Sequence, residues 1–136
     1  MPRKPSATRN GLPLPTDAEL DILAALWRLG PATVREVHEA LQKYSGYTTI
    51  LKQMQVMTEK GLLIRSERFR SHVYEAGLPK EQTRARLAHD LLQRAFEGSA
   101  RELMLGALSA KPVSADELAG IRRMIDAFAK EKGKSR

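Results

Sequence analysis

The stretch GYTTILKQMQVMTEKGLLIRSERFRSHVYEAG, residues 46–77, changes its pattern of side chains halfway along. In its first half, Ile50, Met54 and Met57 recur at helical spacing, which predicts an amphipathic helix. In its second half, the runs LLIRSE and HVYEA alternate loosely and carry β-branched and aromatic residues. Such runs with a turn between them predict a small β-hairpin. The stretch therefore predicts a helix that leads into a hairpin.

Two further helices are expected before this stretch. The segment TDAELDILAALWRLG offers Thr16 or Asp17 as a helix cap and ends in Gly30-Pro31. The segment ATVREVHEALQ starts a second helix with Thr33 as its candidate cap, and KYSG separates it from the third helix. Helix, helix, turn, helix and hairpin in this order form the winged helix-turn-helix pattern.

Beyond the hairpin, short amphipathic helices are expected over residues 80–95, over 100–108, and onward from a capping box of Ser114 and Glu117. In the last of them, apolar residues recur at spacings of 3, 4 and 3, the pattern of helices that pair. Such short helices bury little alone, so we expect a homodimer; packing on the N-terminal domain is the alternative. The residues expected in the dimer contact are Leu91, Leu92, Phe96, Leu103, Leu108, Leu118, Ile121, Ile125 and Phe128.

The fold class expected is mainly α with a small β-hairpin wing. Its parts are a flexible N-terminal arm over residues 1–15, a winged helix-turn-helix domain over 16–79, a helical dimerisation domain over 80–129 and a basic disordered tail over 130–136. The basic residues of the arm, Arg3, Lys4 and Arg9, suit a DNA minor groove, although plain disorder is the other interpretation.

Composition narrows the function. The 136 residues carry a formal charge of +7, which favours a polyanionic partner. No apolar run approaches the roughly 20 residues that a membrane span needs, so we expect a cytoplasmic protein without membrane insertion. The absence of cysteine excludes disulfides, thiolate metal sites and a Cys nucleophile. His38, His72 and His89 lack a metal-ligand partner at helical spacing, so we expect no cofactor and no enzyme activity.

With the apolar face of the third helix inward, Thr48, Thr49 and Lys52 point outward. Such a helix fits the DNA major groove, where hydroxyl, amide and ammonium groups meet base edges. A helix cap and a solvated lysine are the alternative interpretation. The residues expected to contact DNA are Thr33, Arg35, Tyr47, Thr48, Thr49, Lys52 and Gln53 in the helices, and Arg65, Arg68, Arg70 and His72 in the hairpin.

The arginines of the hairpin suit phosphates or the narrow minor groove. Phe69 lies among them at the expected turn, and we expect its ring to pack back on the third helix; contact with a sugar is the alternative. Two other functions stay open at this point. One is a nonspecific architectural DNA binder, and the other is a winged-helix module that binds protein.

Several long stretches of the chain, in this order, resemble one known family. They are TDAELDILAALWRLGPATVREVHEAL, GYTTILKQMQVMTEKGLL, RSHVYEA and AFEGSARELMLGAL, within residues 12–128. They resemble the opening helices, recognition helix, second wing strand and dimerisation segment of the penicillinase-repressor family of bacterial winged-helix regulators, the BlaI/MecI/CopY type.

The resemblance implies a homodimeric repressor that occupies a palindromic double-stranded DNA operator. For the β-lactam branch it also implies a membrane sensor protease that triggers cleavage in the dimerisation region. The matching bond is Ala95-Phe96, where the family has Asn-Phe. The copper-sensing branch uses C-terminal cysteines, which this chain lacks. Lys52 and Val56 stand where the family often has Thr and Arg, so the operator is expected to differ from the penicillinase type.

Overall fold

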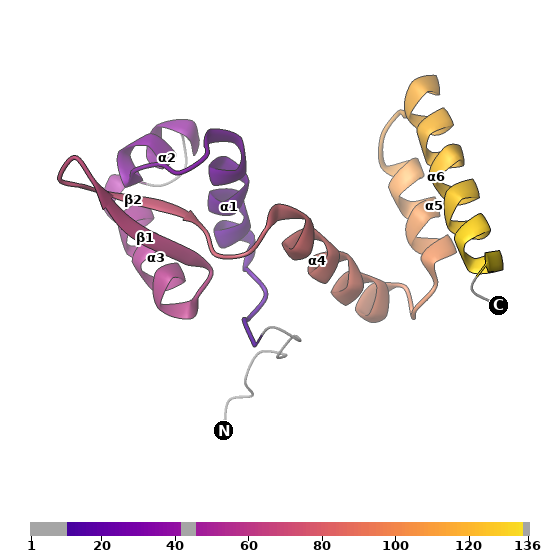
Figure 1. Ribbon diagram of the computed structural model, residues 1–136, viewed down its shortest axis with the longest axis horizontal. Helices are drawn as coiled ribbons and strands as arrows, with labels where there is room; N and C mark the ends of the chain where they lie inside the picture. Colours follow the sequence, from indigo (N-terminus) through magenta and orange to yellow (C-terminus); the bar gives the residue numbers. More distant parts are fainter. Residues whose placement is uncertain (1–10, 42–45, 135–136) are drawn as a thin grey trace. The chain divides into compact units, whose positions relative to one another are not determined.

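The computed structural model describes residues 11–41 and 46–134 (Figure 1). Its elements, in chain order, are α1 (Asp17–Leu29), α2 (Val34–Leu41), α3 (Tyr47–Lys60), β1 (Leu63–Arg68), β2 (Ser71–Ala76), α4 (Lys80–Ala95), α5 (Ala100–Ala110) and α6 (Ala115–Lys134). The predicted class, mainly α with a β-hairpin wing, is confirmed. The break predicted at KYSG lies largely outside the described residues.

Two compact units make up the chain, and the boundary between them falls between Asp90 and Leu91, within α4. We call them the N-terminal unit, which contains α1 to α3, the hairpin and most of α4, and the C-terminal unit, which contains the end of α4 with α5 and α6. The functional division that the sequence predicts between residues 79 and 80 stays a prediction.

The first two helices begin with the same device. At α1, the Glu19 N–H donates to the Thr16 hydroxyl at 3.2 Å, and the Glu19 carboxylate accepts from the Thr16 N–H at 2.9 Å. At α2, Thr33 and Glu36 repeat this reciprocal pair at 3.2 and 2.8 Å. Each capping box satisfies N–H groups that would otherwise lack a helical partner. The sequence left Thr16 and Asp17 open as the first cap, and the structure selects Thr16.

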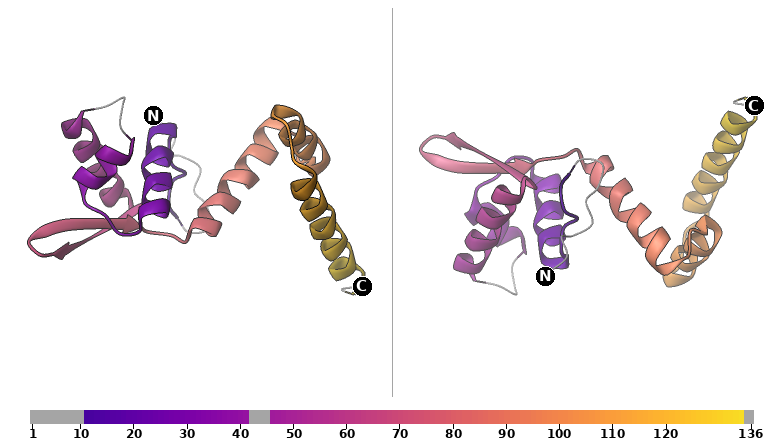
Figure 2. Two further views of the ribbon diagram at one scale, coloured as in Figure 1. Left: turned by 90° about the horizontal axis from the view of Figure 1, so that it is seen from above. Right: turned by 90° about the horizontal axis from the view of Figure 1, so that it is seen from below.

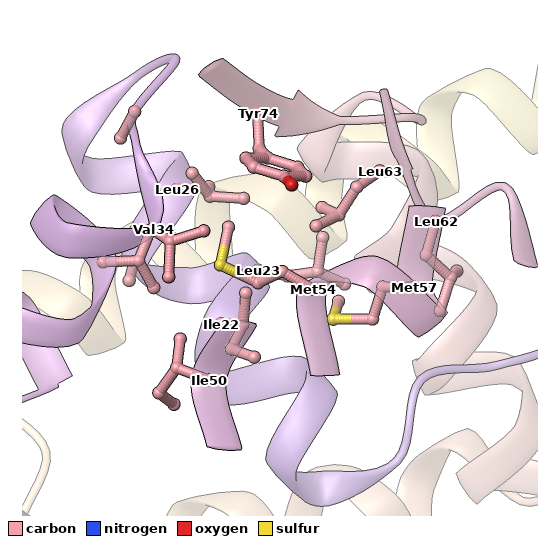
Figure 3. Close-up of a cluster of buried hydrophobic side chains, with 13 residues drawn as sticks. Ile22, Leu23, Leu26, Val34, Ile50, Met54, Met57, Leu62, Leu63 and Tyr74 are labelled. Atoms are coloured by element: carbon pink, nitrogen blue, oxygen red, sulfur yellow. The ribbon is translucent and has the colours of Figure 1, made fainter. Parts of the chain in front are cut away.

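A single hydrophobic core holds the N-terminal unit together (Figure 3). Ile22, Leu23 and Leu26 of α1 meet the buried face of α3, while Val34 and Val37 enter from α2. Leu63 and Tyr74 close the cluster from the hairpin. The side chains labelled in Figure 3 are Ile22, Leu23, Leu26, Val34, Ile50, Met54, Met57, Leu62, Leu63 and Tyr74. Because every one of the first five elements contributes to this core, it fixes α3 and the hairpin relative to each other.

The hairpin is antiparallel, with Leu63 opposite Ala76 at its base and Arg68 opposite Ser71 at its tip. The connection between α1 and α2 adds to it. Ala32 and Tyr74 exchange two backbone hydrogen bonds of 2.9 and 2.8 Å, which extend the ladder by one isolated bridge. The bridge ties the base of the hairpin to the start of α2.

Residues 11–15 differ from the prediction of a flexible arm. Leu12 is half-buried, and a β-carbon on Gly61 would lie only 2.8 Å from Leu12 Cδ2. Gly61 ends α3 with φ 89, a conformation that favours glycine. The Arg86 guanidinium of α4 donates to the Leu12 carbonyl. The prediction is therefore wrong for 11–15, because this segment contacts α4 and the end of α3; Arg3, Lys4 and Arg9 lie outside the described residues.

In the C-terminal unit, α5 is followed by α6 after the short connection of residues 111–114 (Figure 1). The helix α6 continues to Lys134, so the tail predicted to be disordered is helical over 130–134, and only 135–136 lie outside the described residues. Over residues 11–41 and 46–134, no helix has the length and apolar content that would let it cross a membrane.

Candidate nucleic-acid interface

The helix α3 has one buried face and one exposed face. Ile50, Met54 and Met57 are 4%, 0% and 0% exposed, as the helical period predicts. The exposed residues of the other face are Thr48, Thr49, Lys52, Gln55, Val56 and Glu59. Gln53 is half-buried on the flank. The predicted orientation of the helix is confirmed, and contact of this face with DNA stays a prediction.

The N-terminus of α3 differs from those of the other helices. Gly46 precedes it and offers no side-chain cap, and its first turn contains no acidic residue. Within residues 11–41 and 46–134, all the other helices carry Asp or Glu in their first turn. No described residue caps the first amide N–H groups of α3, so these groups and the positive end of the helix dipole can attract an anion such as phosphate.

Three side chains from two helices gather at this end of α3. The Arg35 guanidinium lies over the Tyr47 ring, 5.7 Å from its centroid. The His38 ring meets Tyr47 edge-on, with 6.0 Å between centroids. Tyr47 stays 41% exposed, so α2 fixes its ring on two sides and leaves the rest accessible. We call Arg35, His38 and Tyr47 the α2–α3 cluster.

Two of these residues, Arg35 and Tyr47, are among the predicted contacts, whereas His38 is not. The spacing of three residues between Arg35 and His38 puts both on one face of α2, but that signal has meaning only once α2 packs on α3. Thr33, also predicted to contact DNA, is half-buried, and its hydroxyl is engaged with Glu36. Among the residues that the structure describes, no three His, Asp or Glu side chains gather as a metal site requires.

The opposite end of α3 is anchored by an ion pair. Lys60 Nζ lies 2.6 Å from the Glu19 carboxylate, and the Glu19 side chain is only 7% exposed. Burial raises the pKa of Glu19, but the ion pair with Lys60 and the hydrogen bonds from Thr16 outweigh it, so the pKa lies below its ordinary value of 4.5. The pair holds the last turn of α3 on the first turn of α1.

The basic side chains of the hairpin are exposed to solvent. The predicted contacts Arg65, Arg68, Arg70 and His72 are all exposed. His72 Nε2 lies 4.0 Å from the Glu67 carboxylate, which offsets part of the positive charge. In the two strands only Leu63, Val73 and Tyr74 are buried, and the two residue pairs nearest the tip, Glu67 with His72 and Arg68 with Ser71, are exposed.

The tip of the hairpin departs from the prediction. Phe69 is 91% exposed, so the expected packing of its ring on the third helix is wrong. The physical reason is the length of the hairpin: β1 has six residues, which span about 20 Å and carry the turn beyond α3 (Figure 2). Phe69 and Arg70 form the turn with φ 51 and 67, which disfavours residues other than glycine by about 1–2 kcal/mol each.

The residues predicted for dimerisation are not buried in the single chain. Leu91, Leu118, Ile125 and Phe128 are 48%, 40%, 50% and 70% exposed. The half-buried ones are Leu92, Phe96, Leu103, Leu108 and Ile121. Leu105 and Met124, which were not predicted from the sequence, extend the exposed apolar surface at 57% and 45%. Leu105 lies three residues before Leu108, a helical spacing that the prediction did not use, and Met124 falls outside the 3, 4, 3 spacing.

The bond between Ala95 and Phe96 lies at the end of α4. The Phe96 N–H donates to the Leu92 carbonyl at 3.2 Å, and the Phe96 carbonyl accepts from the Ser99 N–H at 2.8 Å. The Phe96 ring is half-buried, and a β-carbon on Gly106 of α5 would lie 3.5 Å from it. Hydrogen bonds on both sides hold this bond in a compact turn.

Known proteins resemble this chain over most of its length. The penicillinase repressor family pattern matches residues 15–127. The transcriptional regulator BlaI of Mycobacterium tuberculosis is 32% identical over 112 residues, which cover 80% of each chain. The penicillinase repressor of Bacillus licheniformis is 23% identical over 117 residues, 85% of this chain and 91% of that one. A solved MarR family protein from Bacillus stearothermophilus covers 87% of this chain and 75% of its own, with a TM-score of 0.48 and 19% identity. The chain belongs to the penicillinase repressor family.

Proposed function

We propose that this chain is a homodimeric, sequence-specific transcriptional repressor, with one α3 in the major groove of each half of a palindromic operator. The observation that carries the proposal is α3 itself. Its exposed face is polar apart from Val56, and its N-terminus has neither a side-chain cap nor an acidic residue. The N-terminus of α3 therefore favours an anion such as a DNA phosphate. The major groove of B-DNA, about 12 Å wide, admits one helix.

The roles of the other residues follow from this placement. Thr48, Thr49 and Lys52 face the base edges, where lysine suits guanine and a threonine methyl suits thymine. The α2–α3 cluster and the wing arginines flank this face with cations that suit phosphates. Phosphate contacts set the register of the protein on the duplex, and the α3 side chains distinguish sequences.

The C-terminal unit supports the dimer. None of its described residues up to 133 is buried, and its exposed apolar side chains include Leu105, Ile125 and Phe128. A second copy would cover them, and a two-fold dimer presents two α3 helices to inverted half-sites. Two linked contacts bind far more tightly than one, so any event that separates the copies releases the operator.

We further propose release by cleavage at Ala95-Phe96 after a signal from a membrane sensor protease. Proteases bind extended backbone, so the hydrogen bonds at Leu92 and Ser99 must first open. Mass spectrometry of the repressor from cells exposed to a β-lactam tests this. We expect a fragment that ends at Ala95. If the target genes are induced while the chain stays intact, release by cleavage is refuted. The proposal that the chain is a repressor would still stand.

The test of DNA reading is selection of genomic DNA fragments by the purified protein at about 0.15 M salt, which suppresses nonspecific binding. We expect a few sites that share an inverted repeat. Lys52→Ala should change the sequence preference more than the overall affinity, whereas Lys111→Ala, an exposed lysine between α5 and α6, should change neither.

The other outcomes separate the alternatives. Uniform recovery of all fragments, with affinity that falls steeply with salt on any sequence, would indicate an architectural binder. Failure to recover DNA even at low salt would refute DNA binding and favour a protein-interaction module. An unchanged preference profile for Lys52→Ala would remove this residue from the base contacts.

A further inference from the structure

The tip of the wing combines features that hairpin stability does not explain. Phe69 is 91% exposed, the largest exposed fraction among the exposed large hydrophobic side chains of the described residues. It forms, with Arg70, a two-residue turn in which both φ angles are positive. Two-residue turns of this kind favour Asn-Gly or Asp-Gly, whose backbones adopt such angles easily. A phenylalanine therefore disfavours the turn and gains no burial in return.

The surroundings of Phe69 are cationic. Arg68 precedes it, Arg70 follows it, and both are exposed. The nearest acidic residue in the wing, Glu67, lies 4.0 Å from His72. The turn projects beyond the helices of the N-terminal unit in each view (Figures 1 and 2). An apolar residue is thus presented at the end of a narrow ribbon, with an exposed arginine before it and another after it in the sequence.

This combination fits the minor groove of DNA better than it fits a protein surface. Proteins that enter the minor groove pair cations for the phosphates with a single apolar wedge that presses on sugars or between base steps. A protein-binding face would instead present a continuous apolar patch. The other exposed large apolar side chain of the wing is Ile64, which lies near the base of the hairpin.

We propose that Phe69 is a minor-groove wedge that makes binding depend on base pairs outside those read by α3. The inference rests on the proposed function, because it requires α3 to dock in the major groove. Arg68 and Arg70 bind the phosphates on either side of the groove, and the ring contacts the sugars and base edges between them. Sequences that widen or unstack easily, such as pyrimidine–purine steps, are then preferred where the wing lands.

The key variant is Phe69→Asn. Asparagine tolerates positive φ, so it removes the aromatic ring while favouring the turn. We expect unchanged or higher thermal stability together with about tenfold weaker binding, as expected for loss of one aromatic contact with nucleic acid. Ile64→Ala serves as the matched control in the same hairpin and should leave the affinity unchanged.

The probe is the inverted-repeat duplex that the protein binds most tightly in the genomic selection. The base pairs that flank the repeat are replaced one kind at a time. Replacing flanking G·C pairs by inosine·C removes only the minor-groove amino group, and replacing A·T by diaminopurine·T adds one. Wild-type affinity should rise several-fold with inosine and fall several-fold with diaminopurine. Phe69→Asn should respond much less to either change.

Each outcome discriminates. If the wild type selects an inverted repeat but Phe69→Asn binds it equally well, with the same inosine response, the wedge is refuted and the repressor assignment stands. If the variant binds DNA normally but fails to repress in cells, the ring contacts a protein and the wedge is again refuted. If the wild type selects no site, both proposals fail.

Discussion

The two units of this chain use apolar side chains in opposite ways. In the N-terminal unit, α1, α2, α3 and the hairpin converge on one core, and residues such as Ile22 and Met54 are fully buried. In the C-terminal unit, no described residue up to 133 is buried, although Leu105, Ile125 and Phe128 are all apolar. Elements that cross in several directions enclose a core, whereas two helices side by side leave their outer faces open. The C-terminal unit therefore leaves apolar side chains exposed, and a second copy would cover them in the proposed dimer.

Matched methionines test this difference most strongly. Met54 is fully buried in α3, and Met124 is 45% exposed in α6. Met54→Ala should lower the free energy of unfolding of the N-terminal unit by about 2–5 kcal/mol, because it leaves a cavity. Met124→Ala should leave that transition unchanged. Trp27, the only tryptophan, packs against the core and reports it by fluorescence. Equal effects of the two changes would contradict the comparison.

A charge in the exposed apolar surface should separate the two copies of the proposed dimer. Ile125→Asp should weaken dimerisation by about 3 kcal/mol or more, roughly a hundredfold, because association would bury an unpaired carboxylate. Ala127→Asp makes the same charge change on the opposite side of α6 and should leave the dimer intact. Sedimentation at low micromolar concentration measures both. A dimeric Ile125→Asp variant would remove this residue from the contact.

Two glycines contrast a tight and an open backbone. A β-carbon on Gly77 would lie 2.4 Å from the Gly61 carbonyl oxygen, whereas one on Gly133 would meet nothing within 4 Å. Gly77→Ala should lower the stability of the N-terminal unit by about 1–3 kcal/mol. Gly133→Ala should instead stabilise the end of α6 by about 0.5–1 kcal/mol. Chemical denaturation, followed by Trp27 fluorescence and by helical circular dichroism, distinguishes the effects of the two substitutions. A Gly77→Ala variant with unchanged stability would refute the close approach of the backbone at Gly77.

The last comparison is between the two capping boxes. Glu19→Gln keeps the box but removes the ion pair with Lys60, and should cost about 1–2 kcal/mol at neutral pH. Because the pKa of Glu19 is lowered in the folded chain, its contribution is present above pH 4.5 and is lost as pH falls through the folded pKa. Wild-type stability should thus fall more steeply than that of the variant below pH 4.5. Glu36→Gln, in the exposed capping box of α2, is the control and should change neither the stability at neutral pH nor its dependence on pH. Parallel curves of stability against pH for the wild type and Glu19→Gln would argue against the ion pair.

Much of the fold follows from local pattern. The period of Ile50, Met54 and Met57 predicted which face of α3 is buried, and Thr33 was correctly identified as a cap. The Phe69 prediction failed because burial of an aromatic is the usual outcome, and nothing in the residues around Phe69 shows how far a hairpin projects. The prediction of a flexible arm failed for residues 11–15, because a proline-rich composition does not show that Leu12 reaches Gly61.

The sequence by itself determined the element order, the inward face of α3 and the position of the cations on α3 and the hairpin. These depend on spacing and capping, which act over three or four residues. Only the tertiary structure decided that His38 braces Tyr47, that Glu19 meets Lys60 across 41 positions, and that Phe69 is left in solvent. Contacts between distant segments depend on how the elements pack, and packing joins residues whose separation in the chain carries no periodic signal.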